Sequence, residues 1–401
     1  MPEPGKLSVF LAVAPRAPRD LSNCLPPLGL GYLAATVRAL DGEPAILHPG
    51  REDLGLPAAQ ARLGSWAARA PGKLVFGLQV FSSDVPIARR WLALVRRDLP
   101  GILRVVGGPH PSGRGKDTLR DLPDADFAFQ GEAEPGFPLL LSGAPATEIP
   151  GLIYREKDEV RENPQAFPGD LDRLGWPAWD LMPPATFPPA PQGLIFRQWP
   201  VAPMMFTRGC PYACTFCAGH TISGKRIRAR SVAGVLAEME MLRTRYQVKE
   251  FHFLDDNFTS DPGRVEEFCR ELLLRRWGVT WCCPNGIRSE RLTPELAVLM
   301  RRSGCYYVSF GIESGSPEIL RRMRKQLDLD RLEGQVDLVR KAGMAVNGFF
   351  LHGFPGETAE DRERTLALAL RLPLDRALFY SFAPLPGSEC WTGLDEDQRP
   401  D

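Results

Sequence analysis

Three cysteines lie close together in the middle of the chain, and their type and spacing suit metal chemistry. Cys210, Cys214 and Cys217 form a C-x3-C-x2-C motif within Thr207-Arg-Gly-Cys-Pro-Tyr-Ala-Cys-Thr-Phe-Cys217. Thiolates are soft ligands that suit iron–sulfur clusters. A loop this short can hold three corners of a 4Fe–4S cluster and supplies no fourth thiolate. The fourth iron would then be open to a substrate or a cofactor.

A zinc site is the main alternative interpretation of the same loop. His220 follows Cys217 by three residues, so a Cys3His ligand set is available. Zinc sites more often use two C-x2-C clamps, and the sequence has no such pair. The spacing therefore favours an iron–sulfur cluster over zinc, and either metal over cysteines that bind none.

The cysteine loop resembles the signature of radical S-adenosylmethionine (SAM) enzymes, in which the open iron chelates the amino and carboxylate groups of SAM. The resemblance implies a partial (β/α)6 barrel, so strands and helices should alternate after Cys217. Apolar runs and helix caps, with Ser231 and Thr358 as N-caps, predict this alternation. The predicted strands are 249–254, 279–283, 306–312, 345–351 and 378–383, and the predicted helices are 231–246, 263–276, 294–303, 331–342 and one after Thr358.

Polar residues follow the predicted strands, at the end where barrel-type folds build their sites. By the resemblance, Asp255, Asp256 and Asn257 would meet the amino group of SAM. The remaining SAM-binding residues that the resemblance implies are Arg288, Glu313 and Ser314 near the ribose or carboxylate, Gly353 and Pro355 in the turn under the adenine, and Phe216 in the cysteine loop. Two of these assignments have an alternative: Arg288 and Glu313 could form an ordinary surface ion pair, and 353–356 could be an ordinary turn.

The N-terminal part of the chain has a second alternating pattern. Strands are predicted at 7–14, 74–80, 103–106 and 127–129, with helices at 27–40 and 86–99. This alternation predicts a doubly wound parallel sheet. Gly107-Gly108 would let a ligand approach the backbone closely. No GxGxxG motif follows the first strand, which argues against a NAD-binding domain.

This pattern resembles the cobalamin-binding domain that precedes the barrel in one large class of radical SAM enzymes. A degenerate Rossmann-like domain without a cofactor is the alternative. The stretch 14–21 has no histidine at the position of the D-x-H-x-x-G motif, so the resemblance implies a cobalt whose lower face has no protein imidazole. His110 would instead contact the nucleotide tail, and His48 is interpreted as a loop residue. The implied cobalamin-binding residues are Pro27, Leu28, Gly29, Ser82, Ser83, Gly107, Gly108, His110, Gly131 and Glu132.

Length and composition set the expected organisation. We expect a cobalamin-binding domain at 1–145, a hairpin and proline-rich linker at 146–200, the barrel at 201–390 and a tail at 391–401. The 401 residues have 49 basic and 49 acidic side chains, so nothing favours a nucleic acid or an anionic membrane as partner. The apolar runs are too short to span a bilayer, and no signal peptide is visible. The nine cysteines, an odd number, indicate a reducing cytoplasm.

The two implied cofactors predict a C-methyltransferase. A reduced cluster would cleave SAM to a 5′-deoxyadenosyl radical that removes hydrogen from a carbon, and methylcobalamin would then supply a methyl group. The expected partners are a small-molecule or peptide substrate and an electron donor such as flavodoxin or ferredoxin. Two alternatives stay open: ring closure, contraction or oxidation without methylation, and a sensor without turnover. A methylthiotransferase is disfavoured, because its N-terminal domain has its own cysteine cluster and only Cys24 lies there.

Overall fold

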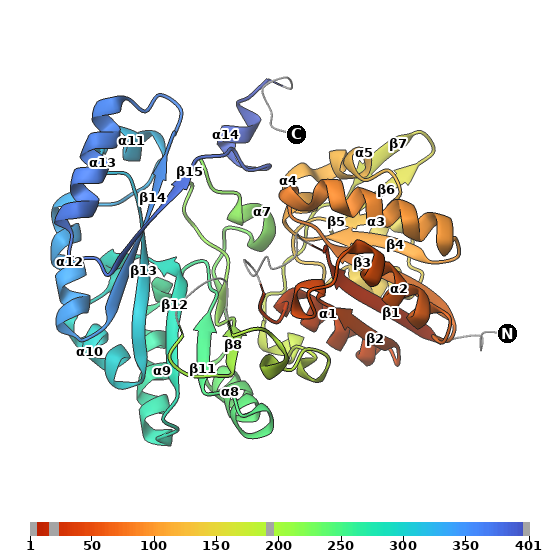
Figure 1. Cartoon of the computed structure of the whole chain (residues 1–401), viewed down its shortest axis with the longest axis horizontal. Coiled ribbons are helices and arrows are strands. Elements are labelled where there is room, and N and C mark those ends of the chain that lie inside the picture. The colour runs from red at the N-terminus through yellow and green to blue at the C-terminus, as the bar shows by residue number, and fades with distance from the viewer. Residues whose placement is uncertain (1–5, 16–23, 190–195, 396–401) are drawn as a thin grey trace. The chain divides into compact units, whose positions relative to one another are not determined.

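The computed structural model describes residues 6–15, 24–189 and 196–395, which form two compact units (Figure 1). The first unit comprises Met1–Ile195 with Thr221–Gly224, and the second comprises Phe196–His220 with Lys225–Asp401. Each unit is built on its own parallel sheet, as the alternating patterns predicted.

The first unit contains a sheet of seven strands in the order β2-β1-β3-β4-β5-β6-β7. The first five strands are parallel, and β6 and β7 add an antiparallel hairpin at the edge. The strands are β1 (Leu7–Val13), β2 (Glu43–Leu47), β3 (Lys73–Gln79), β4 (Leu103–Gly107), β5 (Phe127–Phe129), β6 (Leu152–Glu156) and β7 (Glu159–Glu162).

Helices cover both faces of this sheet, because its strands are apolar on both sides. Along β1, Val9 belongs to a core shared with α1 and α6, whereas Phe10 belongs to a core shared with α2 and α3. This is the doubly wound arrangement that the sequence predicted. The helices are α1 (Leu28–Ala39), α2 (Leu56–Ala67), α3 (Val85–Asp98), α4 (Pro109–Arg114), α5 (Thr118–Asp121) and α6 (Phe137–Leu141).

The expected boundary at 145 does not coincide with a break in the structure. The hairpin assigned to the linker pairs with β5, with Tyr154 opposite Phe127, and so completes the first sheet. The proline-rich segment that follows is packed, since Trp179 and Phe187 are buried, as expected for a segment rich in aromatic residues. Two elements of this unit, β2 and α2, were not predicted from the sequence. The short strand β2 is largely half-buried, so it lacks the fully apolar run of a central strand.

The second unit contains six parallel strands in the order β15-β14-β13-β12-β11-β8 (Figure 1). Each strand lies beside its predecessor in this sheet, which is the topology of the predicted partial barrel. A separate two-stranded ribbon, β9 (Thr207–Arg208) with β10 (Arg228–Ala229), flanks the cysteine loop. The six strands are β8 (Val201–Met204), β11 (Glu250–Phe253), β12 (Thr280–Ile287), β13 (Cys305–Glu313), β14 (Ala345–His352) and β15 (Arg376–Ser381).

Helices follow these strands in turn and begin at side-chain caps. Ser231 caps α8 and Thr358 forms a capping box with Asp361 at α13, both as predicted. Phe268 of α9 packs edge-on against Phe253 and Trp281, which marks the helix-facing side of the sheet. The helices are α7 (Gly219–Ser223), α8 (Val232–Tyr246), α9 (Pro262–Arg275), α10 (Pro294–Arg302), α11 (Pro317–Arg322), α12 (Leu329–Lys341), α13 (Ala359–Arg371) and α14 (Glu389–Thr392).

None of the helices in the described ranges is both long and apolar enough to cross a membrane.

Candidate functional site

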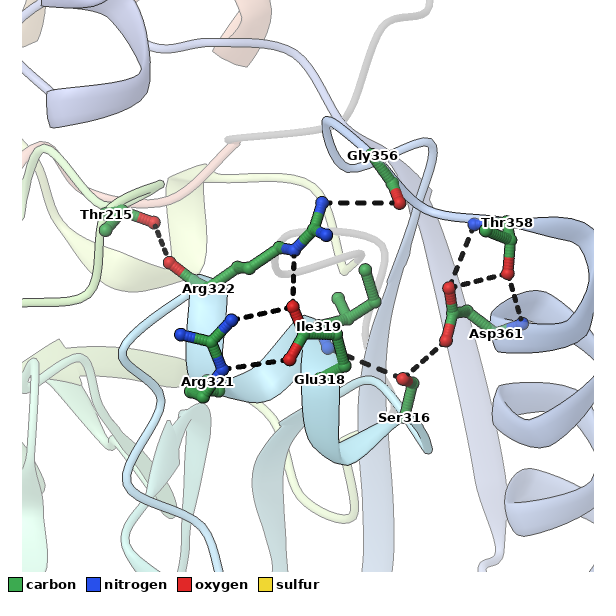
Figure 2. Close-up of polar contacts among 9 residues, drawn as sticks. All are labelled: Thr215, Ser316, Glu318, Ile319, Arg321, Arg322, Gly356, Thr358 and Asp361. Atoms are coloured by element: carbon green, nitrogen blue, oxygen red, sulfur yellow. Dashed lines mark hydrogen bonds and ion pairs between the residues drawn. The ribbon is translucent and has the colours of Figure 1, made fainter.

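The cysteine loop joins β9 to α7 and is anchored at one residue between its second and third cysteines. The Thr215 amide donates to the carbonyl of Met323 (3.0 Å). Its hydroxyl donates to the carbonyl of Arg322 (3.2 Å), as Figure 2 shows. The Cys390 amide in turn donates to the Thr215 carbonyl (3.0 Å). The loop is therefore fixed to the end of α11 and the start of α14.

The three thiols are free of disulfides and differ in exposure. Cys210 and Cys214 are half-buried, whereas Cys217 is exposed and its sulfur accepts a hydrogen bond from the Gly219 amide (3.3 Å). Burial raises the pKa of the Cys210 and Cys214 thiols above its ordinary value. Because a four-iron cluster spreads its protein ligands over different irons, three soft donors in one anchored loop fit such a cluster.

The described residues contain no group of three or more His, Cys, Asp or Glu side chains arranged to hold a single metal ion.

Two cations lie beside this loop. The guanidinium carbon of Arg288 is 4.0 Å from the ring centroid of Tyr212, inside the loop. The ammonium of Lys325 is 2.9 Å from a carboxylate oxygen of Glu313, at the end of β13. Burial raises the pKa of Cys214, and the charges of Lys325 and Arg288 oppose that rise. The cations therefore favour the thiolate form, which is the form that binds metal.

The three polar residues that follow β11 have different surroundings. The buried Asp255 carboxylate accepts hydrogen bonds from the amides of Phe206 (3.1 Å) and Thr207 and from the Thr207 hydroxyl (2.7 Å). Burial raises the pKa of Asp255 to about 7. Its oxygens thus fix the strand that leads into the cysteine loop. Asp255 therefore has a structural use, and the contact of Asp255, Asp256 and Asn257 with the amino group of SAM stays a prediction.

The two residues after Asp255 differ in environment. Asp256 is exposed, and its Oδ1 lies 4.0 Å from the position that a Cβ would occupy on Gly219, just after the cysteine loop. Asn257 is buried, and its Oδ1 has no hydrogen-bond partner among the described residues. An unpaired buried acceptor is costly unless something donates to it, so Asn257 is suited to an amino or hydroxyl group of a bound molecule.

The turn predicted to lie under the adenine contacts the cysteine loop. Phe216 packs on a cluster formed by Ile319, Met323 and Phe354, the last of which is the second residue of the Gly353–Gly356 turn. Both glycines of the turn have positive φ (83° and 79°). Arg322 donates to the Gly356 carbonyl (3.5 Å) from α11, as Figure 2 shows, and Pro355 is exposed. The structure therefore brings Phe216, Gly353 and Pro355 to one side of the unit.

Ser314 is held inside the second unit by side-chain hydrogen bonds, and its predicted contact with SAM stays a prediction. It is fully buried, and its hydroxyl lies 3.1 Å from that of Thr365 and accepts the Ser316 amide (3.1 Å). These bonds join the end of β13 to α13 and account for the burial of Ser314 without a ligand.

In the first unit, several predicted cobalamin-binding residues gather after β3 and β4. The buried His110 has Nδ1 3.1 Å from the Ser82 hydroxyl and Nε2 3.2 Å from a carboxylate oxygen of Asp121. Arg114 also pairs with Asp121 (2.8 Å). Burial alone would raise the pKa of Asp121, but His110 and Arg114 bring it below its ordinary value. Gly108 has φ 102°, which favours glycine at this turn.

The other predicted residues of this unit lie on neighbouring segments. The Gly131 amide donates to the hydroxyl of Ser112 (2.9 Å), which ties the turn after β5 to α4. Glu132 is buried, and Ser83 lies next to Ser82 in a short 3-10 turn. Pro27 is the N-cap of α1, so Leu28 and Gly29 form its first turn. Most of the histidine-free stretch 14–21 lies outside the described residues.

Sequence reasoning missed four residues that organise these sites. They are Thr215, Lys325, Arg114 and Asp121. Thr215 gains its role from a residue 107 positions away. Lys325, Arg114 and Asp121 lie outside every motif, and their partners are 12 or 7 positions away. Only Thr215 had a usable signal, since it lies between two cysteines of the motif.

Comparison with known proteins agrees with this arrangement. The family model of the radical SAM superfamily matches residues 204–369. An uncharacterized methyltransferase of Pyrococcus horikoshii is 31% identical over 371 residues, which cover 91% of this chain and 78% of that protein. Cytidylyl-2-hydroxyethylphosphonate methyltransferase of Streptomyces wedmorensis is 28% identical over 97% of this chain and 82% of its own length. An anaerobic magnesium-protoporphyrin IX monomethyl ester cyclase of Rubrivivax gelatinosus is 27% identical over 94% of this chain and 67% of its own.

Among solved structures, the radical S-adenosylmethionine methyltransferase TsrM from Kitasatospora setae has the same fold. Its structure with tryptophan substrate and a SAM analogue superposes with a TM-score of 0.76, covers 95% of this chain and 75% of that one, and is 19% identical. At this identity the likeness concerns the fold alone.

Proposed function

The chain belongs to the radical SAM superfamily, and we propose that it is a cobalamin-dependent C-methyltransferase. One observation carries the proposal: a single chain combines an anchored three-cysteine loop with a doubly wound unit whose strand order is 2-1-3-4-5. In that order, ligands bind where β1 and β3 lie side by side and their connections diverge.

The first unit offers cobalamin a glycine-rich edge and a histidine that is already engaged. Both ring nitrogens of His110 face other side chains, Ser82 and Asp121. A cobalt ion therefore finds no uncommitted imidazole at this turn. Gly107 and Gly108 let a large planar ligand approach the backbone after β4.

The second unit holds the residues for the cluster and SAM. When bound, these groups supply a radical that removes hydrogen from carbon, and methylcobalamin supplies the methyl group. Cys210, Cys214 and Cys217 hold the cluster, while Phe216 and the 353–356 turn position the adenine. Because Cys217 is exposed, an electron donor such as a flavodoxin or ferredoxin has access to this corner of the loop.

The test of methylation is product labelling. Full-length protein, reconstituted with iron, sulfide and cobalamin, is incubated with methyl-deuterated SAM and candidate small molecules or peptides. Methylation predicts one labelled methyl group per product, with one S-adenosylhomocysteine and one 5′-deoxyadenosine formed per turnover. A product without label would exclude methyl transfer.

Ring formation without methylation is the second candidate, and similarity to a ring-forming cyclase favours it. In the same experiment, a cyclised and unlabelled product formed with 5′-deoxyadenosine would establish that chemistry. Absence of any SAM cleavage by a fully loaded cluster would leave the sensor alternative.

A further inference from the structure

The sheet of the second unit has one face packed on helices and one face turned away from them. Near the start of the strands, the face turned away is closed by a buried polar network. The Glu250 carboxylate accepts hydrogen bonds from the hydroxyls of Tyr306 (2.6 Å) and Thr280 (2.8 Å), and it lies 2.8 Å from Nε2 of His252. Glu250 and His252 are fully buried, so this part of the face is closed to a ligand.

The same face is open at β14 and β15, where the sheet ends (Figure 1). Phe349 pairs in register with Leu378, and its ring lies edge-on to Tyr380 with the centroids 5.9 Å apart. Tyr380 is 50% exposed, and the other two are half-buried. Side chains alternate along a strand, so Phe350 and Phe379, which stack on each other, belong to the opposite face. We call Phe349, Leu378 and Tyr380 the apolar wall. A contiguous exposed surface of this kind is typical of a binding site.

The apolar wall lies next to a residue predicted to bind SAM. Phe349 pairs in register with Gly311, and a Cβ on Gly311 would lie 2.7 Å from Glu313 Oε1. On β12, Gly286 has φ 109°, and a Cβ there would lie 3.8 Å from the ring of Phe349. Glycine at position 286 therefore keeps a side chain away from this ring. A ligand that packs on Phe349 would lie beside the predicted SAM site.

An arginine extends the apolar wall. Arg376 pairs in register with Asn347 and precedes Leu378 by two residues, so it lies on the same face, about 7 Å along the strand. Its side chain is exposed, and no ion pair or hydrogen bond of its guanidinium occurs among the described residues. The neighbouring acid, Asp375, is already paired with Arg340 (2.9 Å). A guanidinium binds carboxylates and phosphates through its planar fork of donors.

We propose that the apolar wall and Arg376 bind the substrate, and that this substrate is a small molecule with a flat unsaturated ring and an anionic group, a carboxylate or a phosphate. The inference rests on the proposed function, because it takes the substrate to lie beside SAM. The ring packs on the apolar wall, where aromatic contacts contribute beyond the area they bury, and the anion pairs with Arg376. A neutral apolar ligand would leave Arg376 without an anion, and a small polar ligand would leave the rings in water.

The test uses four probes that separate the ring from the charge. 2-Naphthoate and 2-naphthyl phosphate have both, 2-naphthamide has the ring alone, and decahydro-2-naphthoate has the carboxylate on a saturated ring. Dissociation constants are measured by ligand-observed NMR on full-length, cluster-loaded protein with SAM and without reductant. At least one anionic naphthalene should bind about two- to tenfold more tightly than the amide and the saturated acid. The tighter of the two identifies the anion. Equal binding of all four probes, or binding of none, would overturn the proposal.

Matched variants locate the probe. Arg376→Gln should weaken binding of the anionic naphthalenes about two- to fivefold and leave that of 2-naphthamide unchanged. Phe349→Leu should weaken binding of all three naphthalenes about two- to tenfold. Phe379→Leu makes the same change on the opposite face of the neighbouring strand, and Arg302→Gln makes the charge change at an exposed arginine of α10. Neither control should change any of the four constants.

Three results would contradict the assignment. Equal losses in Phe349→Leu and Phe379→Leu would show that the stability of the sheet edge is measured and not a contact. A wild-type dimer that dissociates in Phe349→Leu, measured by light scattering, would show that a second copy of the chain covers the apolar wall. Normal cleavage of SAM without selectivity among the probes would overturn the substrate class alone. A wild type that neither binds nor cleaves SAM would overturn the proposed function itself.

Discussion

The two parallel sheets of this chain create a ligand site in different ways. In the first sheet β1 and β3 are neighbours although β2 comes between them in the sequence, so the connections from these strands run to opposite faces. A crevice arises there from topology alone. In the second sheet every strand from β11 onward lies beside the previous one, and no such reversal occurs. Its site must be built from the segments that follow the strands.

This difference decides what the polar residues do. In the second unit, two predicted SAM-binding residues also support the segments: Asp255 holds the strand before the cysteine loop, and Ser314 joins β13 to α13. In the first unit the crevice needs less support, and its polar residues pair with one another, as His110 does with Ser82 and Asp121. A site built from long segments therefore uses some of its polar residues to hold those segments in place.

The largest effect should come from removing a cluster ligand. Cys214→Ala leaves two thiolates, which cannot hold three corners of a cluster. Iron after anaerobic reconstitution should fall from about four per chain to near zero, and reductive cleavage of SAM should be lost. Cobalamin retention should not change, because the first unit has its own core.

Cys390→Ala is the matched control for this experiment. It removes a half-buried thiol next to the loop but keeps the amide that bonds to Thr215. Full iron content is expected. Stoichiometric zinc in the wild type without iron would contradict the cluster.

The second effect concerns the scaffold carboxylate Asp255 and depends on pH. Burial raises its pKa from an ordinary 3.8 to about 7 in the folded protein. The folded state thus binds the proton more tightly than the unfolded state, and stability should fall as pH rises from about 4 to 7, by at most about 1.4 kcal/mol per pH unit. Below pH 4 and above pH 7 this contribution should be constant.

Asp255→Asn removes this titration while keeping the shape of the side chain. Hydrogen exchange in 250–287, corrected for its intrinsic pH dependence, should show the slope in the wild-type protein without cofactors and a flatter profile in the variant. Identical profiles would mean that Asp255 does not titrate in this range. The variant should also load less iron, because an amide cannot accept all the donors from Phe206 and Thr207.

A smaller effect distinguishes the two glycines of the 353–356 turn. Both have positive φ, so Gly353→Ala and Gly356→Ala each carry a backbone cost of about 1 kcal/mol or more. At Gly353 a Cβ meets nothing within 4 Å, whereas at Gly356 it would lie 1.9 Å from Arg322 Nη1. Gly356→Ala must therefore also displace Arg322, which touches both Glu318 and the carbonyl of Gly356 (Figure 2).

The two variants are compared by thermal unfolding and by SAM affinity. We expect a greater loss of stability and a several-fold greater loss of SAM affinity in Gly356→Ala, because this variant also displaces Arg322, whose carbonyl anchors Thr215. Equal affinities would show that the turn and the cysteine loop act independently.

The sequence predicted the elements that have a regular apolar pattern or a helix cap, and it singled out the loop with three cysteines. Strands such as β13 and helices with caps such as Ser231 follow from local patterns. The cysteine spacing predicts the cluster loop. The pairing of Lys325 with Glu313 and of Arg114 with Asp121 could not be predicted in this way. The partners are 12 and 7 positions apart, and no local pattern in the sequence marks the turn that brings them together. The use of Asp255 as scaffold was hidden for the same reason, since its partners lie 48 and 49 residues away.

The smallest expected effect is that of His110→Ala, which should leave the ligands of cobalt unchanged. Nδ1 of His110 faces a hydroxyl and Nε2 faces a carboxylate, and the ring is buried within the α4 region. To bind cobalt, it would have to break both contacts and leave Asp121 with Arg114 alone. Electron spin resonance of the cob(II)alamin form should therefore show no nitrogen coupling from the lower face, in the wild type and in His110→Ala alike. Cobalamin affinity should fall only a few-fold in that variant, because a single buried hydrogen-bonding group near the site is lost.

Ser82→Ala provides the comparison: it removes one partner of the ring, and any release of His110 toward cobalt should then appear as a new nitrogen splitting. A splitting present in the wild type and lost in His110→Ala would show that the imidazole binds cobalt, and that the first unit presents a ligand of its own where we expect only a crevice.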